Sequence, residues 1–177
     1  MFKHVQRGLT LVEASTASAI AAAALVTAVP GFGDLLDARR AEGVAAELAT
    51  DLRFARSEAV SRNAGVRVRL QGDADGTRCY VIHTGGAGAC SCLDAGPPVC
   101  SSDAEPIKAV RFAGDDRVRV QANVGSMLFD PVRGTVTPTG TLTILAADGR
   151  QMRHVVNILG RVRSCAAVGD WAGLKPC

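Results

Sequence analysis

The sequence predicts an α+β protein in which one long N-terminal helix packs on an antiparallel β-sheet. Two patterns lead to this fold class. In residues 34–62, apolar side chains recur mostly at spacings of three and four, as on one face of a helix: Leu36, Ala41, Val44, Leu48, Leu52, Ala55 and Ala59. After Gly65, apolar and polar residues alternate in short segments, which is typical of half-buried strands.

An Ala-rich apolar stretch, residues 14–32, precedes the amphipathic helix. Its length is close to the roughly 20 residues that a membrane-spanning helix requires, although alanine adds little membrane affinity. Pro30, followed by Gly31, predicts a kink in this helix. We therefore expect a helix that rests in a membrane and can leave it readily.

A short basic leader, residues 1–8, stands before the apolar stretch. A secretory signal peptide would carry its cleavage site after the apolar stretch, whereas Gly8 precedes it. The leader resembles that of type IV prepilins in the run Arg7-Gly8-Leu9-Thr10-Leu11-Val12-Glu13. This resemblance implies that a prepilin peptidase cuts after Gly8 and methylates the new N-terminus, Leu9, where the family usually has phenylalanine.

Glu13 is an unexpected residue in an apolar helix, because a carboxylate near a bilayer centre is costly unless a partner compensates it. The pilin resemblance implies that this side chain meets the N-terminal amine of a neighbouring subunit during assembly. An alternative is a helix-capping box, since Thr10 and Glu13 have the Thr-x-x-Glu spacing, but capping does not explain the leader. The implied partners are other pilins or pseudopilins. The implied location is the bacterial inner membrane before assembly, then a pilus with the head in the periplasm or outside the cell.

Six or seven short strands are expected after the helix, separated by turn-forming residues. Their ranges are 66–70, 80–82, 110–112, 118–120, 127–129, 140–145 and 154–158. The helix stop before them is predicted at Asn63-Ala64-Gly65.

The end of the long helix carries a narrower resemblance. Leu52-Arg53-Phe54-Ala55-Arg56-Ser57-Glu58-Ala59 resembles the Leu-x-x-Ala-Arg-Ser-Glu-Ala run of the GspH/FimT family of minor pilins and pseudopilins. Later segments resemble that family as well: Phe129-Asp130-Pro131, 134–137 and 160–163. The resemblance implies a type IV pilin-like fold with five parts: a leader (1–8), a hydrophobic helix (9–33), an amphipathic helix (34–64), a β-rich head (65–164) and a tail (165–177).

Six cysteines in an exported domain indicate disulfides. Cys165 and Cys177 bracket the tail, and a bond between them would contribute about 3 kcal/mol on the chain-entropy model. The other four allow three connectivities among themselves: Cys79, Cys90, Cys92 and Cys100. A four-sulfur metal site is the alternative, but the paired Cys-x-x-Cys elements are absent from the sequence. We predict no metal and no cofactor.

Three arginine pairs alternate with valine in the predicted strands. The formal net charge is +3, and loss of Lys3 and Arg7 with the leader leaves 3 − 2 = +1, so affinity for a polyanion would need a local cluster. The pairs at 67/69 and 117/119 are expected to be solvated. Arg161 and Arg163 differ, because Gly-Arg-x-Arg resembles the motif through which FimT-type minor pilins bind DNA during natural transformation. Guanidinium groups suit phosphate binding.

The tail adds one positive charge, Lys175, and one aromatic side chain, Trp171. Trp171 could stack on a base of single-stranded DNA, and it could equally be a packing anchor. Binding of DNA through so few phosphates would be non-specific and dependent on salt.

An enzyme is not expected, because His83 and His154 are not in a catalytic spacing with a nucleophile and residues 85–88 lack the lysine of a phosphate-binding loop. The sequence favours a minor pilin of a type IV pilus that binds extracellular DNA. The alternatives are a structural pseudopilin of type II secretion, as in the GspH branch, and a structural minor pilin with no DNA role.

Overall fold

The computed structural model describes residues 10–177 apart from 75, 95 and 113–116, and it omits the side chains of 27–32 and 34. The chain divides into two compact units, residues 1–36 and residues 37–177. We call the second the globular unit. The fold class is confirmed: one helix region is followed by antiparallel strands.

The helix α1 (Leu11–Arg62) begins in the first unit and ends in the globular unit. Thr10 caps its start, since the backbone N–H of Glu13 donates to Thr10 Oγ1 at 3.3 Å. In the part of the chain that the structure describes, no helix combines the length and hydropathy needed to cross a membrane. The kink expected at Pro30 falls among the residues whose side chains are not described, and it stays a prediction.

The second half of α1 buries most of the predicted apolar stripe, but Leu36 is 45% exposed and Val44 is only partly buried. Five of its residues are fully enclosed: Ala41, Leu48, Leu52, Ala55 and Ala59. The helix ends at Arg62 because Asn63 takes a left-handed conformation with φ of 47°, and the Ala64 N–H then returns to the Ala59 carbonyl at 3.2 Å. This is the geometry of a Schellman-type stop.

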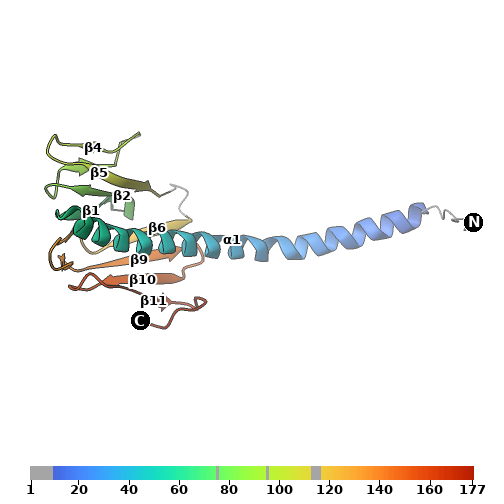
Figure 1. Ribbon diagram of the computed structural model, residues 1–177. Coiled ribbons are helices and arrows are strands. Elements are labelled where there is room, and N and C mark those ends of the chain that lie inside the picture. The colour runs from blue at the N-terminus through green and yellow to red at the C-terminus, as the bar shows by residue number, and fades with distance from the viewer. Residues whose placement is uncertain (1–9, 75, 95, 113–116) are drawn as a thin grey trace, which may run out of the picture. The chain divides into compact units, whose positions relative to one another are not determined.

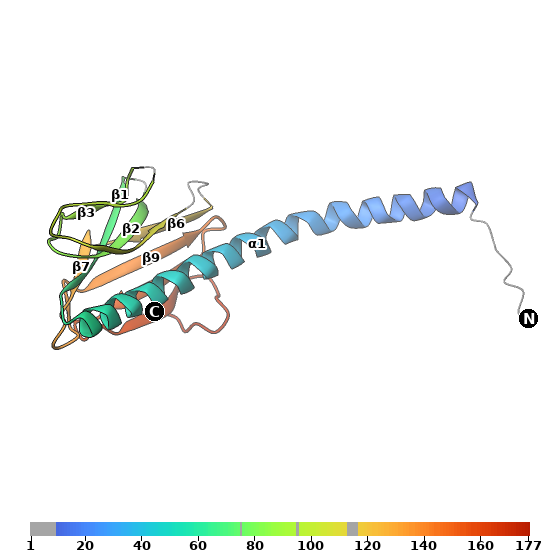
Figure 2. The ribbon, with the colours of Figure 1, turned by 45° about the horizontal axis from the view of Figure 1, so that its top comes forward.

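Eleven strands follow in the described residues: β1 (Val66–Asp73), β2 (Gly76–Thr84), β3 (Cys90–Ser91), β4 (Val99–Cys100), β5 (Pro106–Arg111), β6 (Val118–Ala122), β7 (Ser126–Phe129), β8 (Val136–Thr137), β9 (Gly140–Ala146), β10 (Gln151–Val156) and β11 (Val162–Val168). Nine of them form one antiparallel sheet in the order β11-β10-β9-β6-β2-β1-β7-β8, with β5 also paired to β2. The globular part of α1 lies along one face of this sheet (Figures 1 and 2).

The core lies between α1 and the sheet. β9 directs alternate residues toward the helix, which gives it a regular burial pattern with Leu142 and Ile144 fully enclosed. The sheet's two halves join through one residue pair, Thr77 of β2 and Val120 of β6. Among the described residues, every strongly buried side chain lies between Ala38 and Trp171, so the globular unit contains the described core. We therefore expect the globular unit to fold by itself.

Two polar anchors fix α1 on opposite flanks. On the β2 and β5 flank, the buried Asp51 carboxylate accepts a hydrogen bond from Tyr80 Oη at 2.6 Å, and Lys108 Nζ lies 2.7 Å from it. On the β10 flank, His154 Nε2 donates to the Ala45 carbonyl at 2.8 Å. Burial lowers the pKa of His154 below its ordinary value, with the Arg53 charge as a smaller cause, so the imidazole is neutral at pH 7.

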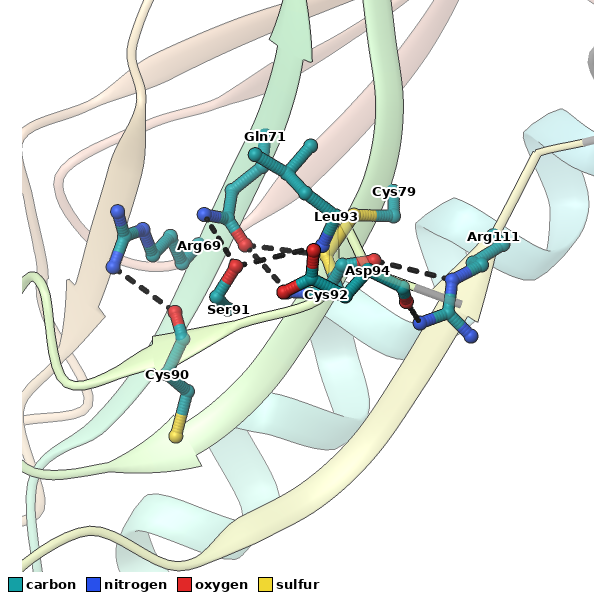
Figure 3. Close-up of a disulfide and its surroundings, with 9 residues drawn as sticks. All are labelled: Arg69, Gln71, Cys79, Cys90, Ser91, Cys92, Leu93, Asp94 and Arg111. Atoms are coloured by element: carbon teal, nitrogen blue, oxygen red, sulfur yellow. Dashed lines mark hydrogen bonds between the residues drawn. A yellow bond between two sulfur atoms is a disulfide. The ribbon is translucent and has the colours of Figure 1, made fainter. Parts of the chain in front are cut away.

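A small lobe between β2 and β5 contains β3 and β4, and two disulfides hold it: Cys79–Cys92 and Cys90–Cys100. Figure 3 shows how polar side chains fasten its backbone. Arg69 donates to the Cys90 carbonyl at 2.9 Å, the Cys92 N–H donates to Gln71 at 2.8 Å, and Arg111 donates to the Cys92 and Asp94 carbonyls. The structure thus selects one of the three connectivities left open by the sequence.

The expectation that Arg67 and Arg69 are solvated is wrong. Both side chains are partly buried, and Arg67 donates to Ser126 Oγ at 3.3 Å while its buried Nε has no hydrogen-bond partner among the described residues. The neighbouring His83 is fully buried, and its pKa is lowered first by burial and then by the two arginine charges. Arg119 is exposed as expected, whereas Arg117 is exposed but ion-paired with Asp37 at 3.1 Å.

The expected strand at residues 154–158 is too long at its C-terminal end. β10 ends at Val156 because the next four residues form a turn, in which the Gly160 N–H donates to the Asn157 carbonyl at 2.9 Å. Ile158 continues the strand-like pattern past Val156. However, the side chain of Asn157 offers the backbone a local hydrogen-bond partner, and this ends the strand.

Candidate functional site

The turn between β10 and β11 determines where the Gly-Arg-x-Arg segment begins. Asn157 organises it, because its side-chain oxygen accepts from the N–H groups of Leu159 at 3.1 Å and Arg161 at 3.0 Å. The Asn157 N–H also donates to the Arg161 carbonyl at 3.1 Å. Arg161 is therefore held at both backbone groups, immediately before β11.

Gly160 is required by packing as well as by backbone conformation. Its φ is +70°, and a Cβ at this position would lie 2.6 Å from the Gly134 carbonyl oxygen and 3.1 Å from Arg56 Cδ. Arg56 comes from α1 and donates from Nε to the same Gly134 carbonyl at 3.1 Å. The first residue of the motif thus packs directly against the end of the helix.

Arg163 is exposed on the sheet face that points away from α1. It pairs with Val155, whereas its neighbours Val162 and Ser164 pair with the buried Val156 and His154 on the helix-facing side. Ser164 also donates to His154 Nδ1 at 2.8 Å, which fastens β11 to β10 beside the arginine. The side chain of Arg161 is exposed too.

The tail closes back on β11 through the Cys165–Cys177 disulfide. Between these cysteines, the Ala166 N–H donates to the Lys175 carbonyl at 2.8 Å, and the Cys177 N–H donates to the Ala166 carbonyl at 2.9 Å. These bonds occupy part of the free edge of β11 and hold the exposed Lys175 next to it.

Trp171 is a packing anchor and not a stacking surface. It is only 4% exposed, its indole N–H donates to the Gln151 carbonyl at 3.2 Å, and the Arg150 guanidinium lies over the ring at 4.7 Å. A base could not reach this ring without displacing the tail.

The predicted DNA-binding cations are not neutralised within the globular unit. Among the described residues, no acidic oxygen lies within 4 Å of the charged groups of Arg161, Arg163 or Lys175. By contrast, Arg62 is paired with both Glu58 and Glu105. Cations without acidic partners can bind phosphate oxygens without first breaking an ion pair.

A groove runs between the end of α1 and the start of β11, with a volume of about 780 Å³. Eight residues line it: Arg53, Arg56, Ser57, Val60, Ser61, Gly160, Arg161 and Val162. Arg53 and Arg56 carry no motif or charge cluster in the sequence that predicts a site. Their spacing of three places them on one helix face, but only the structure shows that β11 lies beside that face.

The leader residues Gly8 and Leu9 lie outside the described residues. Glu13 is described, is exposed and belongs to the first turn of α1, where Thr10 caps its N–H. Half of the capping box is therefore formed, and this backbone bond leaves the Glu13 carboxylate available for another partner.

The comparisons with known proteins match the globular unit. A family model described as type II transport protein GspH matches residues 44–160, from the middle of α1 to the glycine of the motif. The chain belongs to the GspH family. This membership supports a minor pilin or pseudopilin of a type IV pilus or a type II secretion system. A search of curated proteins found no match.

Two solved structures are similar to this GspH-family chain. The minor pseudopilin EpsH of Vibrio cholerae matches with a TM-score of 0.46 and 18% identity, over 71% of this chain and 96% of the other. The minor pilin FimU of Pseudomonas aeruginosa matches with a TM-score of 0.51 and 21% identity, covering 71% of this chain and 96% of the other. The FimU match confirms the type IV pilin-like fold expected from the sequence.

Proposed function

We propose that this GspH-family protein is a minor pilin of a type IV pilus that binds extracellular DNA for natural transformation. The observation that carries the proposal is that Arg161, Arg163 and Lys175, on β11 or next to it in the chain and the tail, are exposed and have no acidic partners among the described residues. The hairpin turn fixes the first arginine, and the terminal disulfide fixes the lysine.

Binding through three cations should be weak and should not depend on base sequence. Phosphate contacts fix a protein on DNA without reading bases, and affinity falls with salt as counterions are displaced. Several copies in one filament would raise the effective affinity by avidity.

The test is binding of a fluorescent DNA duplex to the fragment 35–177, which contains the whole core. We expect Arg161→Ala/Arg163→Ala to weaken binding at least tenfold, about the effect of losing two charged hydrogen bonds, and to reduce the salt slope by about 2. Fluorescence anisotropy across a salt series gives both quantities, and circular dichroism checks that the variant is folded.

The matched control is Arg39→Ala/Arg40→Ala, which removes the same charge from exposed α1 positions of the globular unit. It should weaken binding less than twofold. Equal losses in the two double variants would contradict a site at the C-terminal arginines. Absence of binding by the wild-type fragment at low salt would contradict DNA capture by the single head.

The match to the GspH family model favours a second candidate function, that of a structural pseudopilin of type II secretion. A structural minor pilin without a DNA role is the related alternative. In both, the head contacts neighbouring pilins, and the C-terminal arginines are merely solvated. Loss of pilus assembly or secretion on gene deletion, with no DNA binding by the fragment, would favour these functions.

We also propose that a prepilin peptidase cleaves after Gly8 and methylates Leu9, and that the hydrophobic helix of residues 9–33 resides in the inner membrane before it joins other pilins. Intact-mass measurement of the membrane-extracted protein should find a chain that begins at methylated Leu9. Gly8→Ala should keep the leader, and a normal-length product would contradict the assignment. Glu13→Ala separates assembly from processing, because it should still be cleaved while less of it enters filaments.

A further inference from the structure

We infer that the groove between α1 and β11 binds a single strand of DNA, so that the globular unit prefers single-stranded to duplex DNA. This inference rests on the proposed DNA-binding function and adds the strand form of the ligand. It also adds Arg53 and Val60 of α1, which are outside the Gly-Arg-x-Arg segment, to the binding surface.

The charge of the groove favours a polyanion. Three of its eight lining residues are arginines, and none of the eight is acidic. The acidic residues of this part of α1 are engaged elsewhere: Glu47 and Asp51 pair with Lys108, and Glu58 pairs with Arg62. The groove is therefore lined by Arg53 of this helix and not by its acidic side chains.

The arginines of the groove differ in how free they are. Arg56 is partly buried, and its Nε is already committed to the Gly134 carbonyl, so it supports the wall of the groove. Arg53 is exposed, and within the described ranges it makes no ion pair or side-chain hydrogen bond. Together with Arg161 on the opposite wall, it offers two guanidinium groups to successive phosphates.

The apolar lining distinguishes a single strand from a duplex. Val60 is 55% exposed in the groove, beside the less exposed Val162, and the adjoining hairpin turn carries Ile158 at 60% and Leu159 at 52% exposure. A duplex keeps its base faces stacked inside and can offer this surface only phosphates and sugars. A single strand can place bases against Val60 and the plane of Arg53 while its phosphates meet the guanidinium groups.

The volume is suited to the same ligand. About 780 Å³ falls in the range of pockets that enclose drug-sized molecules, and a nucleotide is of that size. Arg163 lies on the opposite face of β11 and does not line the groove, so the single strand would contact Arg53 and Arg161 there.

The test compares two probes on the fragment 35–177: a fluorescent oligothymidine of about 20 nucleotides and a duplex of the same length. We expect the wild type to bind the single strand about fivefold more tightly. Arg53→Gln should weaken single-strand binding about fivefold and duplex binding less than twofold, and Val60→Glu should weaken single-strand binding about tenfold. Arg39→Gln, the matched control, removes the same charge about 21 Å along the helix and should change neither affinity.

The possible outcomes distinguish failure of the single-strand inference from failure of the proposed DNA-binding function. If both probes bind equally, and Arg53→Gln and Val60→Glu change nothing while Arg161→Ala/Arg163→Ala abolishes binding, the groove is overturned and DNA binding at the C-terminal arginines stands. If neither probe binds the wild type at low salt, both proposals are overturned. A single-strand preference that both folded groove variants remove would support the inference.

Discussion

Replacing Gly160 by alanine should lower the free energy of unfolding of the fragment 35–177 by about 3 kcal/mol. Two costs add at this position. A residue with a side chain is strained at φ of +70°, and its Cβ would lie 2.6 Å from the Gly134 carbonyl oxygen. The Gly134 carbonyl cannot easily move away from the added Cβ, because it is part of the backbone and accepts a hydrogen bond from Arg56. Urea unfolding followed by circular dichroism measures the loss.

Gly149→Ala is the matched control, because Gly149 also has a positive φ, +84°, but nothing lies within 4 Å of the added Cβ. It should cost only the conformational term, about 1 kcal/mol. Equal losses in the two variants would contradict the packing role of Gly160. The comparison matters for function because a folded Gly160→Ala protein would have Arg161 and Arg56 displaced, and its DNA binding should fall although both arginines remain.

Sequence patterns predicted the local elements well and the long-range arrangement poorly. The alternation in 66–70 and 140–145 predicted β1 and β9, because each strand has one face against α1 and shows this directly in its residues. Nothing in those segments indicates that β6 pairs with β9 on one side and touches β2 at Thr77 on the other. Such pairings depend on strands far apart in the chain.

In the candidate site, some residues could likewise be predicted from the sequence and others could not. Arg161, Arg163 and Lys175 were found by motif and charge, which need only the sequence. The partners of Gly160 were not, since Arg56 and Gly134 are 78 residues apart and meet only in the folded chain. Likewise, the solvated state expected of Arg67 and Arg69 is wrong because both side chains contact distant parts of the chain: Arg69 donates to the Cys90 carbonyl of the lobe, and Arg67 donates to Ser126 of β7.

Asp51→Ala should destabilise the globular unit by about 3 kcal/mol, because it leaves the hydroxyl of Tyr80 buried without an acceptor and Lys108 without its closest carboxylate. Tyr80 is fully buried. Its pKa is raised far above the ordinary value, mainly by burial and secondly by the nearby Asp51 carboxylate, so its hydroxyl stays protonated and donates the hydrogen bond. The hydrogen bond from Lys108 to Asp51, in turn, raises the lysine pKa. Urea unfolding measures the loss.

Glu47→Ala provides the control, since Glu47 reaches the same lysine at 3.3 Å from an exposed position and should cost less than about 1 kcal/mol. In the double variant Asp51→Ala/Tyr80→Phe, both the buried donor and its acceptor are gone. It should therefore be less destabilised than the sum of the single variants. Strict additivity would contradict a coupled buried pair. The pair of Asp51 and Tyr80 anchors α1 on the flank opposite β11, so Asp51→Ala should also loosen the helix that carries Arg53. Binding of single-stranded DNA should therefore weaken, although Asp51 does not line the groove.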